Sequence, residues 1–424
     1  MSRAGASQGP ARAGAPAENV VTEPSPLRNT RFRVFAAGNL VNNIGESVYA
    51  TALPLLAYRL TGALSVMSLL AAAVPIAMLL APSLGTVADR WGPRVLVVPG
   101  LLLQAAAALG MNVLLLAGVD STAALFCCAL LVAVGAAAYR TGWMTGVPGM
   151  FPEFPVRARG MLNSGFFATT LIGPLVVTAS LTFIGYTGLL WLNLATFFAP
   201  ILVWALGVHP PRAARQSGSG TQWKMSEGWR AVTQDRRLSE MLVVQVVLNI
   251  ACGAGLNSLL VFALGRSWHL SGDAVGLALT VMNACMLVGN LLVAQRTRLR
   301  PWTALALGMT ARAGSLLLLA VAPSFPVFLI AMAVGALGQG AVLSTVVMMR
   351  VKYLPGAVLG RASGLMWLIT GAASLLSPVL TPLFDRLAGS SLTFLLLGIA
   401  TCGAVGHLCR SRAHWAEKPT STTV

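Results

Sequence analysis

Apolar stretches of about the length that spans a bilayer recur from one end of this chain to the other. A hydrocarbon core of about 30 Å is crossed by roughly 20 residues of α-helix. Because lipid offers the backbone N–H and C=O groups no partner, each stretch must be helical. The chain is 56% hydrophobic and only 10% charged, which excludes a soluble protein of 424 residues. We count twelve predicted spans, at 33–58, 63–88, 95–117, 121–143, 158–182, 185–207, 238–264, 271–294, 302–321, 324–348, 358–383 and 388–409.

The basic residues indicate how these spans are oriented. A formal net charge of +17 would suggest nucleic-acid binding in a soluble protein, but 25 of the 29 lysines and arginines fall on one side of the predicted membrane. The other side holds Arg59, Arg266 and Arg386. The positive-inside rule therefore predicts a multi-pass protein of the plasma (inner) membrane with both termini cytoplasmic, and no nucleic-acid partner. Arg312 lies inside the ninth span and is expected to pair with a carboxylate or to reach water.

Composition divides the chain into five segments. Residues 1–29 contain no apolar run and are expected to be a disordered cytoplasmic segment. Residues 208–237 are polar and basic, and they are expected to be a cytoplasmic linker between two six-helix bundles at 30–207 and 238–409. Residues 410–424 are the predicted cytoplasmic tail.

An internal repeat supports the division into two halves. A shift of 204 residues carries Arg157-Ala158-x-Gly160 onto Arg361-Ala362-x-Gly364, and Gly173-Pro174 onto Ser377-Pro378. Agreement at separate places is hard to attribute to chance. We therefore predict an all-α membrane protein with twelve transmembrane helices in two pseudo-symmetric six-helix bundles.

A charged turn separates the second and third predicted spans. Its pattern, Gly-x3-Asp-Arg-x-Gly-x-Arg, is formed by Gly85, Asp89, Arg90, Gly92 and Arg94. This pattern resembles the signature loop between the second and third helices of the major facilitator superfamily, and the resemblance extends over most of the chain. It implies the major facilitator fold, with parallel halves around a midplane cavity, and transport of a small molecule. Pro93 stands where the family often has a basic residue.

The same turn is a candidate conformational gate. The Asp89 carboxylate could accept hydrogen bonds from the positive N-terminal end of the eleventh helix, which begins close to Arg361, when the cytoplasmic mouth closes. Gly85 would permit close helix approach and Gly92 a tight turn. The alternative is that Asp89, Arg90 and Arg94 only shape the turn and enforce topology.

Glu46 is the one acidic residue, among twelve, that the predicted spans place well within the membrane. A low dielectric disfavours the carboxylate form, so this group is expected to take a proton near neutral pH and to release it when wetted. The chain resembles the drug and siderophore exporters of the family, which carry an acidic residue in this region of the first helix. We expect Glu46 to couple transport to protons. The alternatives are a structural glutamate bonded to asparagine neighbours, or a site for a cationic substrate without proton movement.

Other polar and aromatic residues are candidates for a substrate cavity. On the first helix, Asn39, Asn42 and Tyr49 share a face with Glu46, at spacings of 3, 4 and 3 residues. On the seventh helix one face carries Gln245, Asn249 and Asn257. For each of these, helix packing or lipid contact is the alternative. Further candidates are Asn163, Phe166 and Trp367.

The fourth and fifth helices match the exporter branch only in part. Gly160 and Gly173-Pro174 stand at the spacing of the antiporter motif of this superfamily, and three of its six positions match. Gly173-Pro174 is also a predicted helix kink in its own right. The arginine of the fourth-helix motif would fall at Leu131, and the nearest arginine is Arg140, which we place close to the cytoplasmic end.

These features predict proton-coupled export of a small amphipathic compound, such as a drug, siderophore or secondary metabolite, by alternating access. A low charge count in the cavity favours neutral or cationic substrates over phosphorylated or strongly anionic ones. The alternatives are a nutrient importer of the same fold and a transport-dead membrane protein with an assembly or sensing role. No enzyme is expected, because there is neither a Gly-rich phosphate loop after a strand nor an ATPase domain. We expect no cofactor and no metal, and a monomer in contact with lipid.

Overall fold

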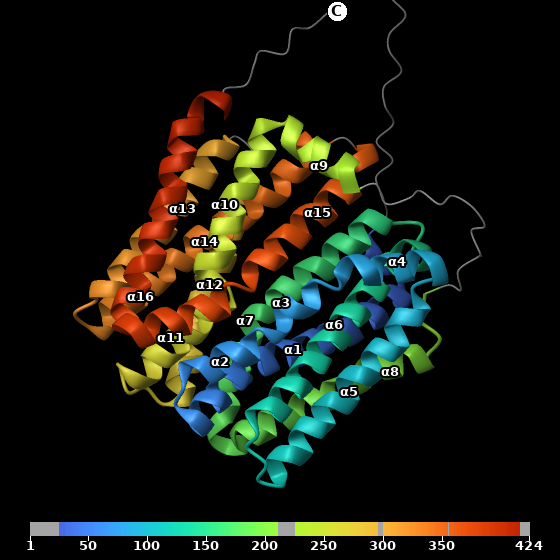
Figure 1. Ribbon diagram of the computed structural model, residues 1–424. Coiled ribbons are helices and arrows are strands. Elements are labelled where there is room, and N and C mark those ends of the chain that lie inside the picture. The colour runs from blue at the N-terminus through green and yellow to red at the C-terminus, as the bar shows by residue number, and fades with distance from the viewer. Residues whose placement is uncertain (1–24, 211–224, 296–299, 355, 416–424) are drawn as a thin grey trace, which may run out of the picture.

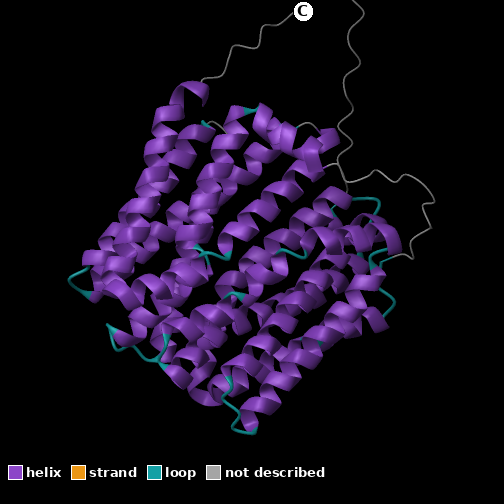
Figure 2. Cartoon of the chain, in the orientation of Figure 1, coloured by secondary structure: helices purple, strands orange, loops and turns teal. Residues whose placement is uncertain are grey.

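The computed structural model describes residues 25–210, 225–295, 300–354 and 356–415, and every regular element in these ranges is a helix (Figures 1 and 2). The first half contains η1 (Pro26–Arg28), α1 (Thr30–Thr61), α2 (Leu64–Ala71), α3 (Ala73–Met78), α4 (Ala81–Trp91), α5 (Arg94–Leu116), α6 (Thr122–Met150), α7 (Pro155–Thr196) and α8 (Phe198–Ala205). The rest contains α9 (Met225–Gln234), α10 (Arg236–Cys252), α11 (Ala254–Arg266), α12 (Gly272–Gln295), α13 (Pro301–Val321), α14 (Phe325–Tyr353), α15 (Gly356–Ser374), α16 (Ser377–Arg410) and η2 (Ser411–Trp415).

Helix boundaries follow local signals in the sequence. α1 begins after Asn29, whose side chain accepts a hydrogen bond of 3.1 Å from the Phe32 N–H and so caps the helix. It ends before Gly62, which has φ of 60°, and α4 ends before Gly92, which has φ of 87°. Positive φ favours glycine, so the tight turn expected at Gly92 is confirmed.

Within the described residues, nine helical stretches are long and apolar enough to cross a membrane by length and composition. Two of them, Arg157–Ala205 and Ala362–Arg410, have 49 residues each, about twice the length of one crossing. α1 is outside these nine and carries the polar residues Asn42 and Glu46. With α1 added and the two long stretches each counted as two crossings, the chain has the twelve spans that the sequence predicted.

The two long stretches each reverse direction at one glycine. Gly165 and Gly173 of α7 face Leu40 and Ser47 of α1, so this part of α7 runs parallel to α1. Thr196 and Val203, further along, face Gly45 and Gly38 of α1, so the order is reversed. The backbone leaves helical φ and ψ between them at Gly185, with φ of 66°. Gly389, with φ of 77°, makes the corresponding turn within α16.

The two halves pack their helices in the same way. In the first half Gly100 of α5 meets Gly135 of α6, and in the second half Gly308 of α13 meets Gly338 of α14. Glycine at these crossings lets the helix backbones approach closely. In Figure 1 the blue-to-green helices of the first half lie at the lower right, and the yellow-to-red helices of the second half lie mainly at the upper left.

The halves touch along facing helices. At the end of the molecule near Gly185, the Gly185 end, the Tyr58 and Phe262 rings make an edge-to-face contact with 5.9 Å between centroids. Nearby, Arg386 donates to the Ser65 hydroxyl at 3.2 Å. Midway along α7 and α12, the Asn283 amide donates to the Thr170 carbonyl at 2.9 Å.

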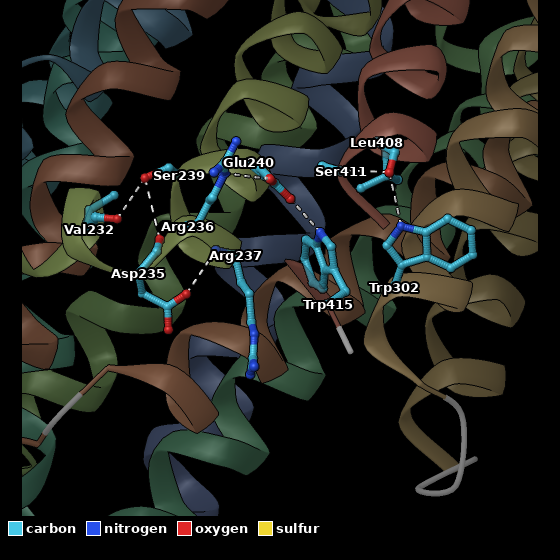
Figure 3. Close-up of polar contacts among 10 residues, drawn as sticks. All are labelled: Val232, Asp235, Arg236, Arg237, Ser239, Glu240, Trp302, Leu408, Ser411 and Trp415. Carbon is cyan, nitrogen blue, oxygen red and sulfur yellow. Dashed lines mark hydrogen bonds and ion pairs between the residues drawn. The ribbon is translucent and has the colours of Figure 1, made fainter. Parts of the chain in front are cut away.

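The opposite end, the α9 end, carries a helix that the sequence did not predict. α9 lies within the predicted linker and buries Val232, whose carbonyl accepts a hydrogen bond of 3.0 Å from Ser239 of α10. Residues 211–224 of that linker, like the predicted N-terminal segment up to residue 24, lie outside the described residues. The last described turn, η2, is fastened here too: the Trp415 indole donates to the buried Glu240 carboxylate, and the Trp302 indole donates to the Leu408 carbonyl at 3.1 Å (Figure 3).

Candidate functional site

The acid singled out from the sequence has two polar neighbours. The Glu46 carboxylate accepts a hydrogen bond of 2.8 Å from the Asn42 amide, one turn earlier on α1. Asn42 is fully buried and Glu46 is half-buried. The Arg140 guanidinium on α6 interacts electrostatically with Glu46. An amide donor from its own helix and a cation from the fourth crossing helix therefore act on this carboxylate.

Arg140 also stacks on an aromatic ring that faces the second half. Its guanidinium carbon lies 3.5 Å from the centroid of the Phe166 ring on α7. Asn163, Phe166 and Thr170 are spaced 3 and 4 residues apart, so they share one helix face. That face meets the second half, because the Thr170 carbonyl accepts the hydrogen bond from Asn283. Asn163, nearer the α9 end, is exposed.

The second half contains a similar cluster. The Arg350 guanidinium of α14 donates to the Gln245 side-chain oxygen of α10 at 3.0 Å. Its carbon lies 5.2 Å from the centroid of the Trp367 ring on α15. Asn249, one turn after Gln245, donates its amide to the Gln245 backbone carbonyl at 2.8 Å. Arg350 is only 6% exposed, whereas Trp367 is 54% exposed.

Trp367 lies on the face of α15 that meets the first half. Gly371, one turn further along α15, faces Met78 and Leu79 of the first half. Residues four apart share a helix face, so Trp367 faces the first half as well. Phe166 thus lies one turn closer to the α9 end than Thr170, and Trp367 one turn closer than Gly371, where the halves are in contact.

The two clusters correspond by pseudo-symmetry. In each half an arginine of the fourth crossing helix stacks on an aromatic residue of the fifth and meets a polar residue of the first. The shift of 204 residues carries Glu46 onto Ile250, and the neighbouring polar residues of the second-half cluster are the amides Gln245 and Asn249. The second-half cluster therefore has amides, whereas the first-half cluster has a carboxylate.

Three predicted cavity residues lie apart from these clusters. Asn39 lines a small pocket inside the first half, with Val97 of α5 and Trp143 of α6 among its neighbours. The Tyr49 hydroxyl is 4.0 Å from the Met111 sulfur of α5, in the same half. Asn257 is exposed on α11. Contact of these three residues with a substrate stays a prediction.

The predicted gate residues have separate surroundings. The Arg94 Nε donates to the Pro210 carbonyl at 2.6 Å, and its guanidinium meets His209 Nδ1 at 2.6 Å, so Arg94 ties the start of α5 to the end of the first half. Arg90 is exposed. A Cβ on Gly85 would meet none of the described atoms within 4 Å, and the close helix approach expected there stays a prediction. The side chains of Asp89 and Arg361 lie outside the described part of the structure.

Gly173 and Arg312 have neighbours that the sequence did not indicate. A Cβ on Gly173 would lie 2.1 Å from the Ser47 Oγ, so this glycine lets α7 press against α1. α7 keeps helical φ and ψ through Gly173 and Pro174 and departs from them at Gly185. Arg312 is 3% exposed, and its Nε donates to the Cys252 sulfur at 3.1 Å, where we expected a carboxylate or water.

Sequence reasoning missed Arg140 and Arg350 as site residues. Both were counted with the basic residues of the cytoplasmic side. Arg140 lies well inside α6, and Arg350, in the last turn of α14, is buried. The internal repeat gave no signal for them, because the two arginines are 210 residues apart and a shift of 204 carries Arg140 onto Ser344.

Solved structures share the whole fold. The chain is similar to a POT family transporter in complex with 5-aminolevulinic acid, with a TM-score of 0.73 and 12% identity over 91% of this chain and 96% of the other. A bacterial homologue of the iron transporter ferroportin, inward-facing, gives 0.68 and 18% identity over 90% and 100% of the two chains. The nucleoside transporter NupG gives 0.65 and 14% over 92% and 100%. At these identities the likeness shows the fold alone.

The sequence itself gives the family. No curated protein sequence matches the chain at a significant level. The sequence profile of the Major Facilitator Superfamily matches residues 35–264 and 242–422, which together cover most of the chain. Helical halves related by pseudo-symmetry, the signature turn at 85–94 and these matches agree, and the chain belongs to the major facilitator superfamily, whose members are transporters.

Proposed function

We propose that the protein is a proton-coupled transporter that exports a small amphipathic compound by alternating access. The observation that carries this proposal is the half-buried Glu46, which accepts a hydrogen bond from Asn42 and interacts electrostatically with Arg140. Ionisable groups inside a membrane are costly, and they mark ion or proton pathways in transporters. The family supports transport, whereas proton coupling and direction rest on this site and on resemblance.

The arrangement offers a way to couple proton and substrate. A carboxylate and a guanidinium attract each other strongly where water is scarce. Arg140 also stacks on Phe166, on the helix face that meets the second half. A movement between the halves, or a substrate on Phe166, would change the distance from Arg140 to Glu46. The carboxyl group would then take a proton on one side and release it on the other.

The direction of transport rests on the partial antiporter motif at Gly160, Gly173 and Pro174. The similar structures are described as nucleoside, iron and POT family transporters, so the fold does not select a substrate. We place the protein in the plasma membrane as a monomer. The α9 end and both termini are assigned to the cytoplasm, because the basic residues concentrate at that end.

We assign the gate to the second half of α4 and the turn that follows it. Asp89 would accept hydrogen bonds from the N-terminal end of α15 when the α9 end closes, with Arg361 as an additional partner. Arg94, through its bonds to Pro210 and His209, would fix the base of this turn.

Growth of an efflux-deficient bacterial host tests the proposal. Wild type, Glu46→Gln and the control Glu153→Gln, an exposed acid between α6 and α7, are expressed at equal membrane levels against a panel of amphipathic toxic compounds. Wild type and Glu153→Gln should protect against some compounds, and Glu46→Gln should not. Equal protection by Glu46→Gln would remove its coupling role. Greater sensitivity on expression would indicate an importer, and no effect of any variant would favour the assembly or sensing role.

A further inference from the structure

Arg350 is a buried cation that has no counter-charge among the described residues. Its side chain contacts the Gln245 oxygen and the Trp367 ring, and no carboxylate of the described residues forms an ion pair with it. Its Nε is buried and makes no hydrogen bond. The corresponding arginine of the first half, Arg140, has Glu46 nearby.

An uncompensated buried guanidinium is costly for the folded protein. Moving a charge from water into the protein interior is unfavourable even after the surrounding protein has relaxed. A well-placed partner charge offsets most of this desolvation penalty. Gln245 supplies one hydrogen bond and no charge, and Asn249, one turn further along α10, is also an uncharged amide. The site would therefore gain most from an anion, which none of the described residues provides.

The neighbouring surface is suited to the rest of such a ligand. Trp367 is 54% exposed, although it lies against a buried arginine, and it faces the first half. A flat apolar group could stack on the indole while its anionic group reached Arg350. Arg312, the other buried cation of this half, lies inside the bundle on Cys252 and Gly335 and has no such exposed ring among its contacts.

We propose that Arg350, Gln245 and Trp367 form a binding subsite for the carboxylate of an amphipathic aromatic or alicyclic monoanion. The proposal deepens the transport function and rests on it. One guanidinium without a counter-charge fits one negative charge, so a monocarboxylate is favoured over a phosphorylated compound. The sequence favoured neutral or cationic substrates because it placed Arg350 with the cytoplasmic loop; its burial beside Trp367 changes that expectation.

Ligand-induced stabilisation of the purified, detergent-solubilised protein tests the subsite without any need for transport. The probes are 2-naphthoate, biphenyl-4-carboxylate and cyclohexanebutyrate, each paired with its primary amide. Wild type should be stabilised more by the acids than by the amides. Arg350→Gln should weaken acid binding by roughly 10- to 100-fold, the usual effect of losing a charge-assisted hydrogen bond, and leave amide binding unchanged. The control Arg230→Gln, an exposed arginine on α9, should keep the preference for acids.

Gln245→Glu covers the case in which Arg350→Gln does not fold. This variant gives Arg350 an internal carboxylate, so it should fold at least as well as wild type and should lose the preference for acids. No acid preference in wild type, or an acid preference that survives in Gln245→Glu, would overturn the proposal. Glu46→Gln should keep the acid preference while it loses proton-coupled protection, so failure of the subsite and failure of the transport function give different results.

Discussion

Gly173 of α7 lies so close to Ser47 of α1 that a Cβ on Gly173 would come within 2.6 Å of the Ser47 backbone carbonyl carbon. Backbone cannot move aside as the end of a flexible side chain can. The first and fifth crossing helices of the first half are therefore held together at a fixed distance, next to Glu46. Ser377 makes the corresponding contact in the second half, where its hydroxyl accepts a hydrogen bond of 3.2 Å from the Gly255 N–H.

Gly173→Ala should destabilise the protein. Overpacking of a close helix contact costs about 1–3 kcal/mol, and here the clash is with backbone. Gly160→Ala on the same helix is the matched control, because a Cβ there meets nothing within 4 Å. Thermal unfolding of both purified variants in detergent gives the comparison. Equal unfolding temperatures would show that α1 and α7 are not held together at Gly173.

Glu46 and Arg140 should be energetically coupled. Glu46→Gln leaves the partly buried Arg140 without its counter-charge, and Arg140→Gln leaves Glu46 without its cation, so each variant should be less stable than wild type. The double variant should recover part of the sum, with a coupling energy of about 0.5–3 kcal/mol. Denaturant unfolding of wild type and the three variants gives the four free energies of unfolding from which this coupling energy is calculated. Simple additivity would mean that the two side chains do not interact.

How much the sequence could predict depends on whether a feature is local. The number and place of the spans follow from bilayer thickness and from the apolar content of each segment, so all twelve were found. The hydrogen bond from the Asn42 side chain to Glu46 could also be predicted, because Asn42 is one helical turn away. Arg350 and Trp367 could not be paired in this way, because their contact depends on how α14 and α15 are placed against each other. α9 was missed because its residues are polar enough to read as a linker.

Asp89→Asn should slow transport and leave ligand binding unchanged. If Asp89 holds the α9 end closed in one state, loss of its charge weakens only that state. Asp120→Asn is the control, an exposed acid in the turn before α6 at the other end. Rates are measured in proteoliposomes with a compound selected by the growth assay, and affinity is measured in detergent. A normal rate for Asp89→Asn would assign the signature turn to topology alone.

Trp415→Phe should weaken the attachment of η2 to α10. The indole donates to the buried Glu240 carboxylate, and a hydrogen bond to a charged group contributes about 1.5–3 kcal/mol. Trp229→Phe, at a half-exposed position on α9, controls for loss of an indole. Limited proteolysis after Arg410 should be faster in Trp415→Phe than in the control. Equal cleavage rates would show that this bond does not fasten the C-terminal turn.

The single-residue turns at Gly185 and Gly389 have a mechanical consequence. In the first half, the arm of α7 before Gly185 touches the second half through Thr170, and the arm after it lies along α1. Because a single residue, Gly185, separates the two arms of α7, no flexible loop can absorb a movement of one arm relative to the other. A displacement of the first arm should therefore be passed directly to the second arm, so we expect each half to move as one rigid body during transport.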